Sequence, residues 1–126
     1  IEYAVKALGI GNIVVMGHGR CGGIQAALNP ASTPLDSGDF IGKWLSMLGD
    51  LPAQIGQNGL MTASERQTAM ERISIRNSIR NLRTFPYVSA LEAEGTLAVH
   101  GAWFDISTGE LWVMDGPSGD FIRPEL

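Results

Sequence analysis

The sequence predicts an α/β domain, and two observations carry that prediction. The short continuous apolar run at 13–16 and the strand-like run at 96–100 have the length and the flanking glycines of buried strands. Around them, apolar residues recur at helical spacing over longer stretches, and strands that alternate with helices are typical of α/β architecture. With 126 residues, 44% of them hydrophobic and 17% charged, the chain fits one ordinary globular domain over 1–126.

The first half of the chain is predicted to hold one strand among several helices. The apolar run at 13–16 ends in glycine, which favours a parallel strand covered on both faces. The remaining predicted elements are a helix over 1–8 stopped by glycines at 9 and 11, a helix over 23–28, a Pro/Ser/Gly-rich loop over 29–39, and a helical face over 40–48 broken at 50–52.

The second half of the chain is predicted to begin with a long helix. Thr62 and Glu65 have the spacing of a capping box, and the helix they open runs to about Phe85, where Pro86 ends it. The elements that follow are a short helix over 87–94 stopped by Gly95, a strand over 96–100, and a hairpin of 103–106 and 111–114 around the turn at 107–109.

Composition excludes several classes of function. The formal net charge is −4 and no stretch of the sequence concentrates Lys and Arg, so we expect no nucleic-acid partner. No apolar run approaches the length of a membrane span, so we expect no membrane association. The single cysteine excludes an internal disulfide and favours a reducing, cytoplasmic location.

The turn at 14–23, VVMGHGRCGG, allows two interpretations. Residues 17–22 satisfy the GxGxxG spacing of a dinucleotide-binding turn, in which glycines follow a strand and open a helix. That fingerprint also needs an acidic residue about twenty positions on, at the end of a second strand. Asp36 and Asp39 lie at about that distance, but within the predicted loop and after no strand. The sequence therefore disfavours a dinucleotide site.

The other interpretation is a metal site. His18 and Cys21 leave a strand end and enter a helix, so their side chains can converge, and zinc accepts imidazole nitrogen and thiolate sulfur together. A buried structural cysteine beside a turn histidine is the alternative, because two ligands do not complete a zinc site. His100, the only other histidine, is predicted to be a hydrogen-bonded structural residue.

The other polar and aromatic residues are predicted to have structural or surface positions rather than roles in a site. Glu71 and Arg72 lie in the long predicted helix, where a solvated or dimer-facing surface is the default expectation for charged residues. The large aromatic residues are interpreted as core or interface; they are Trp44, Trp103, Phe104 and Trp112.

Four segments taken together resemble one protein family. They are IEYAV at 1–5, IVVMGHGRCGG at 13–23, ERISIRNSIRNLRTFP at 71–86 and GTLAVHGAWFD at 95–105. In this order they resemble the β-class carbonic anhydrases, which carry an EYAV helix, an H-x-x-C-G-G turn, a long helix ending in Asn-Leu and Pro, and a G-x-L-x-x-H-G-W strand. Ala102 is an insertion relative to that last motif.

The resemblance implies a fold and a metal site. The fold is a mainly parallel sheet flanked by helices, with a C-terminal hairpin. Family zinc is held by two cysteines and one histidine, and His18 and Cys21 match two of these ligands. The first cysteine and an Asp-Arg pair lie in an upstream C-x-D-x-R motif that these residues do not contain. We therefore expect the C-terminal, larger part of such a domain, lacking its first strands.

The resemblance also implies an activity, the zinc-dependent interconversion of carbon dioxide and bicarbonate. Zinc lowers the pKa of coordinated water to near neutrality, and the amide of Gly22 at a helix start matches a bicarbonate-binding position. The expected partners are a homodimer or higher homo-oligomer and the upstream segment of the same protein. The alternatives are a metal-free, non-catalytic scaffold or interaction domain with this fold, and a sister hydrolase on the same scaffold.

Overall fold

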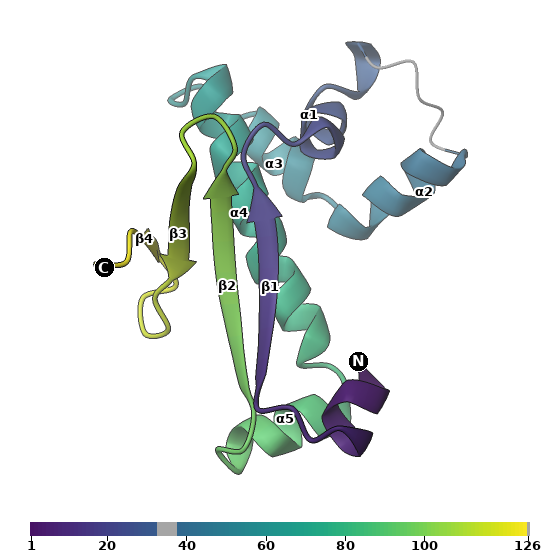
Figure 1. The fold of residues 1–126 in the computed structure, drawn as a ribbon. Coiled ribbons are helices and arrows are strands. Elements are labelled where there is room, and N and C mark those ends of the chain that lie inside the picture. Colours follow the sequence, from purple (N-terminus) through teal and green to yellow (C-terminus); the bar gives the residue numbers. More distant parts are fainter. Residues whose placement is uncertain (33–37, 126) are drawn as a thin grey trace.

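The computed structural model describes residues 1–32 and 38–125 (Figure 1). The Pro/Ser/Gly-rich loop predicted over 29–39 therefore lies partly outside the described residues, and so does Asp36. The elements are η1 (Tyr3–Ala7), β1 (Asn12–His18), α1 (Gly22–Leu28), η2 (Pro30–Ser32), α2 (Phe40–Leu45), η3 (Ser46–Leu48), α3 (Leu51–Gly56), α4 (Ala63–Leu82), α5 (Pro86–Ala93), β2 (Ala98–Asp105), β3 (Glu110–Met114) and β4 (Phe121–Ile122).

The four strands form one mixed sheet in the order β1-β2-β3-β4. Strands β1 and β2 are parallel, with Val14 opposite His100, and β2 and β3 form an antiparallel hairpin with Trp103 opposite Trp112. The α/β class and the C-terminal hairpin are confirmed. The structure joins the predicted strand at 96–100 to the first arm of the hairpin as one strand, and it adds β4, which sequence periodicity does not predict.

Helix α4 covers one face of the sheet. It begins with the predicted capping box, because the Thr62 hydroxyl accepts from the Glu65 amide at 3.2 Å and the Glu65 carboxylate accepts from the Thr62 amide at 2.8 Å. The helix packs across β1 and β2 and buries Ile75 and Ile79 against them (Figure 1). Trp103 and Phe121 complete that core, and a second buried cluster joins Val5, Val88 and Leu97 below it.

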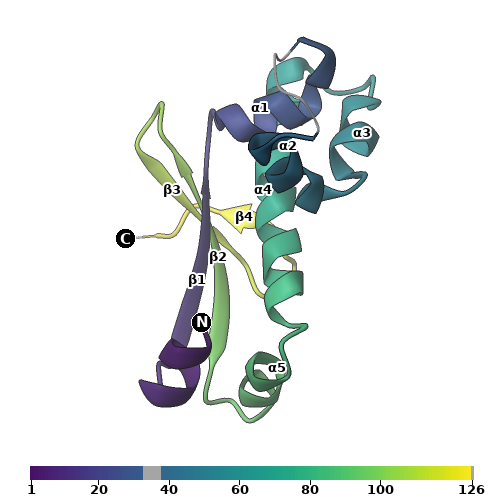
Figure 2. The same cartoon turned by 90° about the vertical axis from the view of Figure 1, so that its right-hand side faces the viewer.

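The prediction that residues 13–16 are covered on both faces is wrong. Their alternate side chains point to opposite sides of the sheet. On one of these sides, Val14 is 60% exposed and Met16 is 66% exposed. Figure 2 shows why: helices α1 to α4 all lie on the other side of β1 and β2. The strand register continues this uncovered apolar face through Phe104 and Leu111 to Ile122, all of which are exposed.

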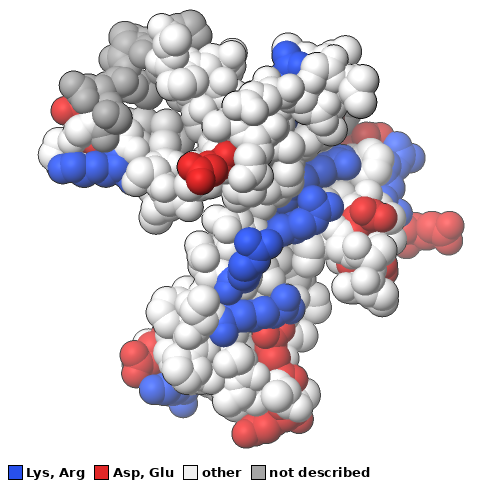
Figure 3. Space-filling view, turned by 180° about the vertical axis from the view of Figure 1, so that it is seen from behind, with Lys and Arg blue, Asp and Glu red and all other residues white. Residues whose placement is uncertain are grey.

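Two further features are visible only in three dimensions. The residues at 50–52 that break the predicted helical face begin a helix of their own, α3, with Pro52 in its first turn. On α4, Arg72, Arg76 and Arg80 follow one another at four-residue spacing. Figure 3 shows a row of basic side chains across the face of the molecule that is seen from behind. Within 1–32 and 38–125, no helix has the length and apolarity needed to cross a membrane.

Candidate functional site

The turn between β1 and α1 lies in close contact with the neighbouring strand β2. β1 ends at His18, and the amide of Gly19 donates to the carbonyl of Phe104 at 2.8 Å, which fastens the turn to the neighbouring strand. A Cβ on Gly19 would lie 3.1 Å from the Trp103 ring, so this close approach favours glycine. Arg20 then reverses the chain with a φ of +59°, and Cys21 is the N-cap of α1.

The turn has the strand-turn-helix form that a dinucleotide fingerprint needs, but the acidic partner is not in place. Asp39 precedes helix α2 as its N-cap and follows no strand among the described residues. Asp105 does end the neighbouring parallel strand β2, but it lies more than eighty residues beyond the turn, and its Oδ1 already accepts from the amide and the hydroxyl of Ser107. The arrangement agrees with the sequence argument against a dinucleotide.

His18 and Cys21 line one cavity of about 360 Å³. One wall is apolar and comes from α2 and η3, where Trp44, Leu45 and Met47 face the cavity, and the Trp44 ring lies so close to Gly23 that an added Cβ would be 3.0 Å from it. The α4 side is polar, and its lining residues are Glu71, Ser74, Asn77, Ser78 and Asn81.

The chemistry of the two predicted ligands suits a metal. Nδ1 of His18 lies 2.9 Å from the carbonyl oxygen of Gly19. Because a carbonyl only accepts, Nδ1 of the neutral ring carries the hydrogen, and Nε2 keeps its lone pair for a ligand. Cys21 is a partly buried free thiol. Among the described residues, however, no group of three or more His, Cys, Asp or Glu side chains is placed to hold a metal ion.

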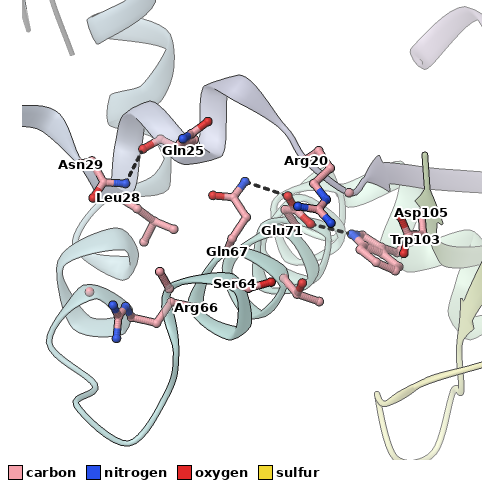
Figure 4. Close-up of a pocket in the computed structure, with 14 residues that line it drawn as sticks. Arg20, Gln25, Leu28, Asn29, Ser64, Arg66, Gln67, Glu71, Trp103 and Asp105 are labelled. Carbon is pink, nitrogen blue, oxygen red and sulfur yellow. Dashed lines mark hydrogen bonds between the residues drawn. The ribbon is translucent and has the colours of Figure 1, made fainter. Parts of the chain in front are cut away.

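The peptide backbone of Cys21 is held by helix α4. Its amide donates to Oε1 of Glu71 at 3.0 Å, and its carbonyl accepts from Nε2 of Gln67 at 3.0 Å. Gln67 also donates to Oε1 of Glu71 at 2.8 Å, and Nε1 of Trp103 donates to Oε2 at 3.0 Å (Figure 4). Glu71 is 2% exposed, so its prediction as a solvated or dimer-facing residue is wrong.

Arg72 is not a freely solvated side chain either. Its guanidinium stacks on the rings of Trp103 and Trp112, at 4.6 and 4.9 Å from their centroids. Burial lowers the pKa of Arg72 and so does neighbouring Arg76, while the Glu71 carboxylate acts in the opposite direction.

The sequence contained a signal for the burial of Glu71. Gln67 and Glu71 continue, at four-residue spacing, the row that Ile75 and Ile79 form on the sheet-facing side of α4. Extending that apolar row toward the helix N-terminus places both polar side chains beneath the turn. The other predicted residues lie elsewhere: His100 bonds to Asn12 at 2.9 Å through Nε2, as a structural residue would.

Gly22 is the first residue of α1 and directly follows Cys21. Apart from its chain neighbours and its own helix backbone, no described residue places a heavy atom within 4 Å of the position that a Cβ on Gly22 would take. A second, polar cavity of about 470 Å³ lies on the far side of the turn, between α1 and α4, where Arg20, Gln67 and Asp105 line it (Figure 4). Glu71 lines both cavities and separates them.

Comparison with known proteins gives consistent matches. The carbonic anhydrase family profile matches residues 1–111. A carbonic anhydrase of Pseudomonas aeruginosa is 34% identical over 122 residues, which are 97% of this chain and 54% of that protein. Beta carbonic anhydrase 3 of Arabidopsis thaliana is 31% identical, with 91% of this chain and 46% of that protein covered. The chain thus spans about half the length of these curated relatives.

Solved structures of β-carbonic anhydrases also match this chain. The β-carbonic anhydrase CcaA superposes on 99% of this chain, and on 56% of its own, with a TM-score of 0.84 and 27% identity. Tetrameric β-carbonic anhydrases from Sordaria macrospora give a TM-score of 0.76 at 27% identity, with 97% of this chain and 59% of theirs covered.

Proposed function

Because the chain belongs to the β-class carbonic anhydrase family, we propose that it is part of an enzyme that interconverts carbon dioxide and bicarbonate. The observation that carries the proposal is that His18 and Cys21 line one cavity, with Nε2 of His18 free to act as a ligand. We propose these two side chains as zinc ligands. Imidazole nitrogen and thiolate sulfur are both donors that zinc accepts, so the pair fits the metal in kind.

The pair does not fill a zinc site, so a third protein ligand has to come from outside the described residues. In the described sheet, β1 pairs only with β2, which leaves its other edge open. Two adjoining cavities run along that edge above α4, one from His18 to Ser78 and the other from Ser78 to Ile1. We propose that an extended segment of the same protein pairs here as a further strand and supplies the missing ligand.

The cavity walls suit a small, weakly polar substrate. Trp44, Leu45 and Met47 present apolar surface beside the two proposed ligands, where carbon dioxide would displace water without losing hydrogen bonds. A zinc ion held there would supply the Lewis acidity that makes water a nucleophile near neutral pH. We further propose that the amide of Gly22, at the start of α1, donates to an oxygen of bicarbonate.

We also propose a homo-oligomeric assembly. The support is the uncovered apolar sheet face that includes Val14 and Met16, together with the tetrameric assembly of the related fungal enzymes. Contiguous exposed apolar surface of this kind marks interaction sites in soluble proteins.

One observation favours a second candidate. Since no cluster of three potential ligands exists among the described residues, a metal-free role of this fold in assembly or binding fits the chain alone. Zinc content and hydration of carbon dioxide separate the two candidates. We expect His18→Gln to lose bound zinc, whereas the matched control His100→Gln keeps it, because His100 bonds to Asn12 and is not among the residues that line the cavity.

Cys21→Ser provides the second arm of this experiment. Its thiol is the only one in the chain, so we expect zinc binding to fall as it does in His18→Gln. Equal zinc content and equal hydration rates in the unmodified chain and in Cys21→Ser would contradict the ligand assignment and favour the metal-free role.

A further inference from the structure

Cys21 is held through its backbone rather than through its side chain. The N–H and the C=O of this one residue are both bonded to side chains of α4, at 3.0 Å to Glu71 and 3.0 Å to Gln67. The two α4 side chains are themselves joined at 2.8 Å, so they form a closed clamp. The Cys21 side chain itself makes no capping hydrogen bond to α1, so the clamp acts on the peptide groups of this residue alone.

The surrounding chain has little stiffness of its own. Gly22 and Gly23 follow Cys21, and Arg20 before it has a positive φ that non-glycine residues seldom adopt. In such a segment, the direction of the Cys21 side chain is set by whatever fixes its peptide groups. Glu71 and Gln67 fix both of them from a twenty-residue helix that is itself packed on the sheet.

The burial of Glu71 is costly unless its carboxylate is fully bonded. Its two oxygens accept three hydrogen bonds, from the Cys21 amide, from Gln67 and from Trp103. An apolar side chain could fill the same space without this requirement, and the row below it does consist of isoleucines at 75 and 79. What an apolar residue could not do is accept the Cys21 N–H.

We infer that Glu71 and Gln67 are positioning residues, which orient Cys21 so that its thiol faces the cavity it shares with His18. This inference rests on the proposed function, in which that thiol is a metal ligand. Outer-shell hydrogen bonds of this type typically contribute 10- to 100-fold, in order of magnitude, to metal affinity.

Cobalt(II) is the probe, because its charge-transfer absorption reports a bond to thiolate sulfur directly. The change is Glu71→Gln, which keeps the shape but turns one acceptor into an NH2 group facing a donor. We expect the cobalt dissociation constant of this variant to rise by about 10- to 100-fold. The matched control is Glu65→Gln, the same substitution on the same helix, where the carboxylate bonds only to the Thr62 amide.

Glu65→Gln should keep the cobalt affinity within about a factor of two, because it disturbs the helix cap and leaves Cys21 untouched; it therefore reports what loss of helix stability alone does. If Glu71→Gln binds cobalt as the unmodified chain does, with an unchanged thiolate band, the inference is overturned. A shared loss of affinity in both variants would overturn it as well, since it would trace to helix stability.

Amide hydrogen exchange distinguishes failure of this inference from failure of the proposed function. If the unmodified chain gives no cobalt-thiolate band, the ligand assignment fails, and the exchange rate of the Cys21 amide still tests the clamp. We expect Glu71→Gln to accelerate exchange at Cys21 while Gly19, held by Phe104 in the same turn, keeps its protection. Equal acceleration at both amides would overturn the positioning role.

Discussion

The indole Nε1 of Trp103 donates a hydrogen bond of 3.0 Å to the buried carboxylate of Glu71. Opposite it on β3, Nε1 of Trp112 is buried and has no hydrogen-bond partner within 1–32 and 38–125, although both rings stack on Arg72. The two tryptophans share the stack on Arg72 and differ in one charge-assisted hydrogen bond and in burial, since Trp103 is the more deeply buried.

We expect Trp103→Phe to destabilise the fold more than Trp112→Phe does. Both changes remove the same ring atoms, but only the first leaves an oxygen of a buried carboxylate without its donor. A hydrogen bond to a charged group contributes about 1.5–3 kcal/mol, and we expect the free energies of unfolding to differ by that amount. Urea denaturation of both variants measures it, and equal losses would show that the bond contributes nothing net.

Gly17 lies where β1 crosses α4, and it leaves no room for a side chain. A Cβ there would be 2.9 Å from Cδ1 and 3.0 Å from Cγ1 of Ile75, which is itself 2% exposed in the core. We expect Gly17→Ala to lower the free energy of unfolding by about 1–3 kcal/mol through overpacking.

A second substitution tests this steric explanation. Ile75→Val removes Cδ1, so in a double-mutant cycle it should offset part of the loss caused by Gly17→Ala. Gly56→Ala at the end of α3 is the control, because outside its own helix backbone and chain neighbours no described atom lies within 4 Å of the added Cβ. Strict additivity of the Gly17 and Ile75 changes would rule out a direct clash.

Local patterns predicted the elements that local physics decides. The capping box at Thr62 satisfies backbone groups within one turn of chain, and the strand-turn-helix at 13–28 follows from an apolar run, glycines and helical spacing. These interactions join residues that are close together in the chain, so the pattern of a single sequence predicts them. The same holds for the hairpin whose arms pair Trp103 with Trp112.

Features that depend on distant parts of the chain were not predicted. Glu71 is buried because a turn fifty residues earlier brings the Cys21 amide to it, whereas its residue type alone assigns a charged side chain to solvent. Val14 and Met16 were expected to be covered because apolar runs usually are. Their exposure reflects the placement of every sheet-covering helix on the opposite side. The arginine row at 72, 76 and 80 is likewise invisible in the net charge of −4.

The N-terminal cap stabilises α4, the helix that carries Gln67 and Glu71 beneath the candidate site. We expect Thr62→Ala to lower the free energy of unfolding by about 0.5–2 kcal/mol, because it frees the Glu65 amide. Thr68→Ala, in the interior of the same helix, is the control and should be neutral or slightly stabilising, since alanine is the better helix former. Thermal unfolding followed by circular dichroism measures both, and a loss in Thr68→Ala as large as in Thr62→Ala would argue against the cap.

Asp105 makes the stability of the β2–β3 turn depend on pH. Its Oδ1 accepts from the hydroxyl of Ser107 at 2.6 Å and from the amide of Ser107 at 2.9 Å, and these bonds lower the pKa of the Asp105 carboxyl in the folded chain. A carboxyl whose pKa is lower in the folded than in the unfolded state stabilises the fold above its ordinary pKa of about 3.9. That contribution is lost as the pH falls through the lowered value.

We therefore expect Asp105→Asn to flatten the acid side of the stability profile, measured by urea denaturation at a series of pH values from about 6 down to about 2. The acid profile of Ser107→Ala should lie between those of the unmodified chain and Asp105→Asn, because this change removes the hydroxyl donor and keeps the amide donor. Some slope persists in both variants, since Ser118 lowers the pKa of Asp115 in the same way. An acid profile of Asp105→Asn that matches the unmodified chain would show that the hydrogen bonds to Asp105 do not couple its ionisation to folding.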